Sequence, residues 1–363
     1  MNSAFVKQRG TLKMAKQIKD ANGKVVAELL QEEDVNSNLD GKTLAVIGYA
    51  SQGRGQSLCY RDSGINTILG LRKNGDSWKL ALEDGWEENK TLFEIPEAVK
   101  KADMILMLIA DTAQPEVYKS QIEPNLSSGK TLVFSHGFNI NFKQITPPKN
   151  VDVSMIAPKG PGRIVREQYE NGFGVPALVA VHQNYTGKAW DNILAMANAI
   201  GATKPGVFKT TFKDEVESDL FGEQVDLCGG VVEMVKHTFE TLVEAGYNPL
   251  LAYWECHHEL HGLIAPLAYK LGNVGMLNSV SLTARKGALA SGKRVMDKHV
   301  KENMKAVLAD IQSGKFAKEW VEEYKKYGFK KMQEELDVLA KHPLETVGVQ
   351  IRKAMWPDEE RHQ

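Results

Sequence analysis

The chain has 363 residues, 42% of them hydrophobic and 25% charged, which is the balance of an ordinary globular protein with room for about two domains. Its 45 basic and 46 acidic residues nearly cancel, so no overall field draws it to nucleic acid or an anionic membrane, and a small molecule is the expected partner. The three cysteines match neither a disulfide framework nor a zinc ribbon, and no apolar run has the length of a signal peptide or a membrane span, which indicates a reducing cytoplasm.

Residues 41–207 carry short β-rich runs that alternate with amphipathic stretches. The runs are KTLAVIG, INTILGL, DMILMLIA, TLVFSHG, VDVSMIAP and GVPALVAVH. This rhythm is typical of a parallel sheet with crossover helices, and because the runs are almost uniformly apolar, helices should cover both faces of the sheet. We therefore expect a doubly wound, Rossmann-like α/β domain here, preceded by an N-terminal extension over residues 1–40.

A glycine-rich loop follows the first of these runs. LAVIGYASQGRGQ places Gly48, Ala50 and Gly53 in G-x-A-x-x-G register between a predicted strand and a predicted helix. Such a loop bends tightly, lets backbone N–H groups approach a pyrophosphate, and directs a helix N-terminus at its charge. Ala50 replaces the usual second glycine, so this approach must tolerate one methyl group. We predict that the loop binds a dinucleotide rather than being a plain tight turn.

The segment RKNGDSW follows the second run, where a dinucleotide fold normally meets the adenosine ribose. Arg72, Lys73 and Ser77 could hold a 2′-phosphate, whereas Asp76 could accept a hydrogen bond from a free 2′-hydroxyl and repel a phosphate. The alternative is a solvated loop with no such role. The sequence therefore leaves both NADP and NAD open.

Beyond the last β-rich run, apolar residues recur at helical spacing. Pro205 and Gly206 precede this change and mark the expected domain boundary. We predict an all-helical domain over residues 208–350, followed by a tail over residues 351–363. Pro266 lies inside one of the helical runs, where proline should kink or break the helix.

Two pairs of acidic residues lie in this helical half. Asp219 and Glu223 are four residues apart in DLFGE, and Glu255 and Glu259 are four apart in ECHHE, so each pair shares one helix face. Four converging carboxylates would repel one another unless divalent cations neutralised them, and ligation by oxygen alone favours Mg²⁺ over zinc or copper. The alternative is that they are ordinary solvent-facing helix charges.

Seven motifs between residues 41 and 294 resemble, in order and approximate spacing, those of the ketol-acid reductoisomerase (acetohydroxy-acid isomeroreductase) family, in its short-chain class. They are GYASQG, VFSHGFNI, MIAPKGPG, ESDLFGEQ, CGG, ECHHEL and SVSLTA. The resemblance implies an N-terminal Rossmann domain, and a knotted, all-α C-terminal domain that pairs two subunits into a homodimer or a larger assembly of dimers. It also implies NADP or NAD and two Mg²⁺ ions as cofactors.

The resemblance assigns roles to particular residues. It implies that Asp219 and Glu223 bind the two Mg²⁺ ions, with Glu255 and Glu259 of the partner subunit completing the site, and that Ser281 contacts the substrate carboxylate. The expected catalytic residues are His136, Lys159 and Glu259. The expected cofactor contacts are Gly48, Ala50, Ser51, Gln52, Gly53, Arg72, Lys73, Asp76, Ser77, Asp111, Gln114, His136 and Gly162.

The implied reaction is a Mg²⁺-dependent alkyl migration in 2-acetolactate or 2-aceto-2-hydroxybutyrate, followed by NAD(P)H reduction to a 2,3-dihydroxy acid in valine, leucine and isoleucine biosynthesis. Glu259 or a metal-bound hydroxide could move the proton, and the sequence does not separate these roles. Two other hypotheses stay open: a divergent 2-keto acid reductase without isomerase activity, and a non-catalytic cofactor-binding protein.

This chain departs from the family's pattern at several positions. The glycine-rich loop reads GYASQGRGQ where the family favours GYGSQGHAH, so Ala50 and Arg54 could alter how the pyrophosphate is held. After Ser281 the chain reads LTARKG where the family commonly has NTAEYG. Arg285 and Lys286 thus replace an acid and a tyrosine, and two added positive charges could change the affinity for an acidic substrate.

Overall fold

The computed structural model describes residues 15–35 and 38–357, and the chain divides after Val216 into two compact units. The first unit is built on a single ten-stranded sheet. Its strands are β1 (Lys16–Lys19), β2 (Val25–Leu30), β3 (Thr43–Ile47), β4 (Asn66–Leu71), β5 (Leu92–Glu94), β6 (Met104–Met107), β7 (Thr131–Phe134), β8 (Asp152–Pro158), β9 (Ala177–Gln183) and β10 (Val207–Lys209).

The strand order is β1-β2-β10-β9-β8-β7-β6-β3-β4-β5, and the six strands from β8 to β5 run parallel. The expectation of a wholly parallel sheet is wrong at β9, which pairs antiparallel with β8. The helix between them, α6 (Gly162–Glu170), packs closely on α1 (Ser51–Asp62), since a Cβ added at Gly162 would lie 2.0 Å from the Ser51 carbonyl oxygen. The chain therefore returns along β9 without completing a crossover over the sheet.

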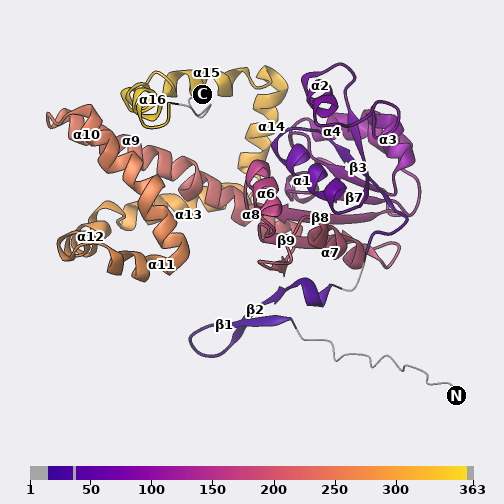
Figure 1. Ribbon diagram of the computed structural model, residues 1–363, viewed down its shortest axis with the longest axis horizontal. Coiled ribbons are helices and arrows are strands. Elements are labelled where there is room, and N and C mark those ends of the chain that lie inside the picture. The colour runs from indigo at the N-terminus through magenta and orange to yellow at the C-terminus, as the bar shows by residue number, and fades with distance from the viewer. Residues whose placement is uncertain (1–14, 36–37, 358–363) are drawn as a thin grey trace. The chain divides into compact units, whose positions relative to one another are not determined.

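Two hydrophobic cores lie on opposite faces of this sheet, as the uniformly apolar strands predict. In β3, Leu44 and Val46 belong to one core, and Ala45 and Ile47 belong to the other. Helices cover the sheet in Figure 1. The helices of this unit are α1, α2 (Asp76–Glu83), α3 (Ile95–Lys101), α4 (Gln114–Val117), α5 (Phe138–Asn141), α6 and α7 (Ala189–Ala199), and its short helical turns are η1 (Glu32–Asp34), η2 (Tyr118–Ile122) and η3 (Glu123–Asn125). The Rossmann-like architecture is confirmed.

Strands β1 and β2 lie within the predicted N-terminal extension, and β2 joins the sheet by antiparallel pairing with β10. At the other end, helix α16 (Pro343–Met355) continues past the predicted start of the tail. The last predicted tail residues, 358–363, and the start of the extension, 1–14, lie outside the described residues. The boundaries of the extension, the two domains and the tail that we predict from the sequence stay predictions.

The second unit is helical, as predicted. Helix α8 (Phe212–Gly222) runs across the division between the units. The elements that follow are η4 (Glu223–Leu227), α9 (Gly229–Glu244), α10 (Pro249–Tyr253), η5 (Trp254–His258), η6 (Leu260–Ile264), α11 (Ala265–Ser279), α12 (Leu282–Val295), α13 (Lys298–Gln312), α14 (Lys315–Tyr327), α15 (Lys330–Leu339) and α16. A core that includes Phe239, Tyr253 and Ile351 joins α9, α10 and α16. Within the described ranges, every helix is too short or too polar to cross a membrane.

Pro266 does not break its helix. It lies in the first turn of α11, directly after the π-helical segment η6, and the backbone at Ala265 remains helical. A π-helical turn before a proline changes which backbone groups pair, so the missing N–H is accommodated there. The helical geometry is interrupted six residues later, at Gly272, where φ is 70° and ψ is 169°.

Candidate active site

The glycine-rich loop has the backbone that close phosphate approach requires. Gly48 has φ of 104°, and a Cβ there would lie 2.6 Å from the Leu108 carbonyl oxygen. A Cβ at Gly53 would lie 2.2 Å from the Gly48 carbonyl oxygen, so neither position accepts a side chain. Ala50 is exposed, with φ of −84°, and its methyl group is therefore tolerated without strain.

The first backbone amide groups of α1 are available to bind an anion. No side chain among the described residues caps α1, so the first amide groups of the helix keep their donors available. The side chain of Gln52 donates from Nε2 to the carbonyl oxygen of Gly160, in the loop just before α6, at 2.9 Å. Predicted contacts Ser51, Gln52 and Gly162 thus lie at one junction, where α1 and α6 meet.

A cavity of about 530 Å³ opens beside this loop, at the carboxyl ends of β4 and β6. Its lining includes four predicted cofactor contacts, namely Gly48, Arg72, Asp76 and Ser77. The fourth residue predicted near the ribose, Lys73, is not part of this lining and forms an ion pair with Glu88 at 2.8 Å. The cavity occupies the place where a doubly wound fold binds the adenosine half of a dinucleotide.

The predicted contacts Asp111 and Gln114 belong to a hydrogen-bonded network behind the same edge of the sheet. The Asn139 side-chain amide donates to Gln114 Oε1 at 2.9 Å and to the Asp111 carbonyl oxygen at 3.0 Å. Gln114 is 4% exposed and donates to the Ile109 carbonyl oxygen at 2.9 Å. This network fixes the loop after β6, and direct contact of its members with a cofactor stays a prediction.

His136 and Lys159 follow the neighbouring parallel strands β7 and β8, so both lie at the carboxyl edge of the sheet with the glycine-rich loop. A buried acid, Glu215 of α8, holds them together. Its carboxylate lies 3.2 Å from His136 Nδ1 and 3.3 Å from Lys159 Nζ, and it accepts from the Gly137 N–H at 2.8 Å. Gly137 permits this approach, because a Cβ there would lie 2.3 Å from the Phe212 carbonyl oxygen.

Glu215 is ionised in this setting. Burial alone would raise the pKa of its carboxyl, but the hydrogen bond and charge of His136, the charge of Lys159 and the Gly137 N–H together hold that pKa below its usual value. Sequence reasoning missed Glu215. The signal that could have found it is its place in FKDEVESD, one helical turn before Asp219 on the same face.

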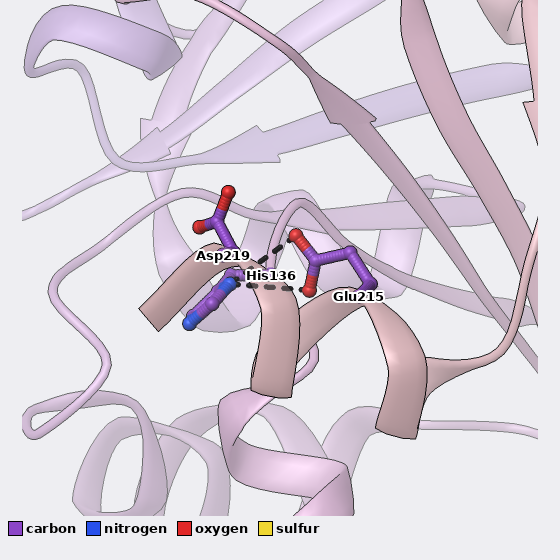
Figure 2. A group of neighbouring side chains, drawn as sticks. All are labelled: His136, Glu215 and Asp219. Carbon is purple, nitrogen blue, oxygen red and sulfur yellow. Dashed lines mark hydrogen bonds and ion pairs between the residues drawn. The ribbon is translucent and has the colours of Figure 1, made fainter. Parts of the chain in front are cut away.

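Figure 2 shows His136, Glu215 and Asp219 grouped around α8, with ligand atoms within 4.8 Å of one another. Glu215 is held by the Gly137 N–H, His136 and Lys159, and Asp219 adds a half-buried carboxylate to the same group, one helical turn further along α8. The Asp219 carboxylate and that of Glu223, one turn further on, are hard oxygen donors of the kind that Mg²⁺ prefers. These residues therefore fit the expected ion.

The other predicted ligands are not gathered with Asp219 in a single chain. Glu223, Glu255 and Glu259 are exposed, and within residues 15–35 and 38–357 they belong to no cluster of three or more metal-binding groups. Their role as ligands stays a prediction.

Ser281 caps the start of α12, and its Oγ accepts from the Ala284 N–H at 3.1 Å. That bond uses a lone pair of the hydroxyl, so its hydrogen can still be donated to a carboxylate. Arg285, one turn later, donates to the carbonyl oxygens of Leu277 and Asn278 at 2.8 and 3.0 Å. Its positive charge is thus used at the carboxyl end of α11, where it complements the helix dipole.

Comparison with known proteins agrees with this geometry. Residues 38–206 match the family model of the acetohydroxy acid isomeroreductase NADPH-binding domain, and residues 212–356 match that of the ketol-acid reductoisomerase C-terminal domain. The ketol-acid reductoisomerase (NADP(+)) of Pyrococcus abyssi is 53% identical over 330 residues, which are 91% of this chain and 98% of that protein. The corresponding protein of Methanocaldococcus jannaschii is 50% identical over 329 residues, covering 90% and 98% of the two chains.

Among solved structures, an NADH-preferring ketol-acid reductoisomerase from an uncultured archean superposes with a TM-score of 0.86 at 46% identity, covering 90% of this chain and 98% of that one. The two family models together match most of the chain, and the chain covers these relatives almost completely. The chain belongs to the ketol-acid reductoisomerase family.

Proposed function

We propose that this chain catalyses the ketol-acid reductoisomerase reaction, which converts 2-acetolactate or 2-aceto-2-hydroxybutyrate into a 2,3-dihydroxy acid during branched-chain amino acid biosynthesis. The observation that carries the proposal is the buried Glu215, which contacts His136 and Lys159 at the carboxyl edge of the Rossmann-like sheet, with the carboxylate of Asp219, the proposed metal ligand, close by. Such a cluster provides positive charge and proton donors where negative charge develops on substrate oxygens.

The reaction has two balanced steps. The substrate's C2 hydroxyl loses its proton and becomes a ketone as the alkyl group moves, with its bonding electrons, from C2 to the neighbouring carbonyl carbon. The oxygen of that carbonyl gains a proton. In the second step the new C2 ketone is reduced, receiving a hydride at carbon and a proton at oxygen. When bound, Mg²⁺ would polarise the carbonyl and stabilise the alkoxide, and the reduced nicotinamide would supply the hydride.

The chain's own residues orient the substrate and move protons. We propose that Lys159 and His136, which both contact Glu215, donate protons to substrate oxygens. Asp219 and Glu223 would hold the metal from α8 and η4. Ser281 would hold the substrate carboxylate through its hydroxyl hydrogen, while the same oxygen keeps its cap on α12.

The exposed Glu255 and Glu259 are assigned to a shared site. We propose that they serve a homodimer in which each subunit lends them to the other, and that Glu259 takes part in proton transfer there. Both carboxylates are exposed in one chain, so they are accessible to a second subunit. The three free thiols are compatible with action in a reducing cytoplasm.

NADP(H) is the expected dinucleotide. The match to an NADPH-binding domain supports it, as do Arg72 and Ser77 in the lining of the adenosine cavity. We propose NADPH as the preferred reductant, although one relative of known structure prefers NADH. Comparing kcat/KM for the two reductants tests this, and the Arg72→Ala variant should lose efficiency with NADPH while keeping its efficiency with NADH.

The metal assignment is tested by titrating Mg²⁺ into the metal-stripped enzyme. Asp219→Asn should lower the rate with 2-acetolactate by roughly 10²-fold or more and raise the Mg²⁺ concentration needed for half-maximal rate. Glu244→Gln, which removes an exposed acid at the end of α9, is the matched control and should leave both quantities unchanged. An Asp219→Asn enzyme with the parent's Mg²⁺ dependence would overturn the assignment.

A further inference from the structure

Tyr49 lies in the glycine-rich loop between Gly48 and Ala50, but it is not among the residues that line the adenosine cavity. It lines a second cavity, together with Ala50, Ser51, Arg54 and Asp84. Tyr49 is 2% exposed, its hydroxyl donates to Asp84 Oδ2 at 2.8 Å, and the same hydroxyl accepts from Trp86 Nε1 at 2.8 Å. One loop residue is therefore anchored outside the cofactor cavity by two hydrogen bonds.

Asp84, the C-terminal cap residue of α2, forms an ion pair with Arg54. The guanidinium donates from Nε to Oδ2 at 2.7 Å and from Nη2 to Oδ1 at 2.8 Å, the two-point geometry that makes such a pair strong and directional. Arg54 is the fourth residue of α1, and its backbone N–H donates to the Ala50 carbonyl oxygen at 2.8 Å. Tyr49, Asp84 and Arg54 thus close a ring around the bend of the loop.

Arg61, two turns further along α1, ties the same segment a second time. It donates from Nη1 to the Asp84 carbonyl oxygen at 2.8 Å, and its guanidinium lies 4.9 Å from the centre of the Trp86 ring. The rings of Tyr49 and Trp86 meet edge to face at 6.3 Å. Asp84 is therefore held from α1 at both its side chain and its backbone, and it forms a firm anchor for Tyr49.

We propose that Arg54 and Asp84 form a positioning pair that holds the glycine-rich loop, through Tyr49, in the conformation that receives the pyrophosphate of the cofactor. The inference rests on the proposed use of a dinucleotide. A loop with a glycine at φ of 104° has many alternative conformations when it is unrestrained, and ordering it on binding would cost affinity. The ring restrains the loop beforehand, and it makes Arg54, one of this chain's departures from the family pattern, part of cofactor binding.

The test measures NADPH affinity separately from chemistry. The dissociation constant is followed by the change in NADPH fluorescence, and KM and kcat are measured with 2-acetolactate and Mg²⁺. Asp84→Asn and Arg54→Gln should each raise the dissociation constant and KM for NADPH by about tenfold, the double variant no further than the worse single one, and kcat at saturating NADPH should stay within about twofold.

Conservative and control variants show whether the effect is one of positioning. Arg54→Lys keeps the charge but loses the two-point geometry, so it should fall between the parent and Arg54→Gln. Tyr49→Phe should reproduce the loss of affinity. Glu302→Gln, which breaks an exposed ion pair between Lys298 and Glu302 on α13, should leave NADPH affinity unchanged.

The outcomes separate cleanly. Variants that lower the melting temperature but bind NADPH as tightly as the parent overturn the proposal, because the pair would then be structural only. A fall in kcat without a change in NADPH affinity overturns it too. A parent protein that binds NADPH but does not turn over 2-acetolactate refutes the proposed function, while the affinities still decide the positioning role. A parent that binds no NADPH overturns both.

Discussion

At the scale of single residues, the site depends on a carboxylate that is almost wholly withdrawn from water. Glu215 is 1% exposed and has a cation or an N–H donor on each oxygen. A buried charge is tolerated only when its surroundings satisfy it, and removing one member leaves the others uncompensated. Glu215 should therefore affect both the stability of the fold and the placement of His136 and Lys159.

Glu215→Gln tests this at one position. The amide keeps the size of the side chain but removes the negative charge, so we expect a loss of about 1–3 kcal/mol in the free energy of unfolding and a roughly 10–100-fold fall in kcat. Denaturant unfolding and steady-state rates measure the two effects. Glu244→Gln changes an exposed acid at the end of α9 and should alter neither. Parent-like turnover in Glu215→Gln would mean that the charge has no part in catalysis.

The thiol of Cys59 provides a second residue-scale prediction. The side chain is completely buried within α1, and this burial raises the pKa of the thiol to about 11. Since the thiolate is the reactive form, Cys59 should resist iodoacetamide at pH 8 in the folded protein and react once the protein is unfolded. Peptide mass spectrometry measures the labelling of Cys59 in the folded and in the unfolded protein. Rapid labelling of Cys59 in the folded protein would contradict the burial described here.

At the scale of elements, the contact between α1 and α6 shapes the phosphate-binding end of the sheet. A Cβ at Gly55 would lie 2.1 Å from the Gly162 carbonyl oxygen, and one at Gly162 would lie 2.0 Å from the Ser51 carbonyl oxygen. The backbones of the two helices therefore touch directly. Any side chain at this crossing must push the start of α1 away from its place beside the loop.

Gly162→Ala should lower the free energy of unfolding by about 1–3 kcal/mol and weaken NADPH binding, because the added methyl group has no space. Gly287→Ala is the matched control. A Cβ there meets open space within α12, so the same substitution should stabilise the protein by about 0.5–1 kcal/mol. The melting temperature should fall in Gly162→Ala and rise in Gly287→Ala, each relative to the parent. A shift of the same sign in both variants would contradict the close contact between α1 and α6.

The strands and the two-part organisation could be predicted from the sequence because they follow from local pattern. The apolar runs became β3, β4, β6, β7, β8 and β9, and the helical half proved helical. The direction of β9 could not be predicted in this way, since it depends on α6 packing against α1 instead of crossing the sheet. The continuous helix through Pro266 depends on the preceding π-helical turn, which no residue pattern announces.

The candidate site was predictable only where motifs carry it. Gly48, Gly53, His136, Lys159 and Asp219 follow from motif and spacing, and the structure places the first four at one edge of the sheet. Glu215 escaped prediction because an acid on a helix is usually exposed, and only the tertiary approach of α8 to Gly137 buries it. From the sequence, only the positive charge of Arg285 could be predicted. Its hydrogen bond to the Leu277 carbonyl oxygen at the end of α11 depends on the tertiary structure.

At the scale of the whole molecule, the chain combines a dinucleotide-binding unit with a helical unit that carries the paired acids. Glu223, Glu255 and Glu259, the other ligands that we propose, are exposed in one chain and form no cluster of three or more metal-binding groups within its described part. Because the proposed site draws on two subunits, we expect activity from an assembly of at least two copies, and we propose that this assembly performs both the isomerisation and the reduction.

That claim is tested most directly by initial rates of NADPH oxidation with 2-acetolactate and with 3-hydroxy-3-methyl-2-ketobutyrate, the already rearranged keto acid, each with and without Mg²⁺. We expect NADPH oxidation with both acids when Mg²⁺ is present, and loss of turnover of 2-acetolactate when Mg²⁺ is removed. Oxidation with the keto acid but none with 2-acetolactate would reveal a reductase without isomerase activity. Folded protein that oxidises NADPH with neither acid would contradict the assignment altogether.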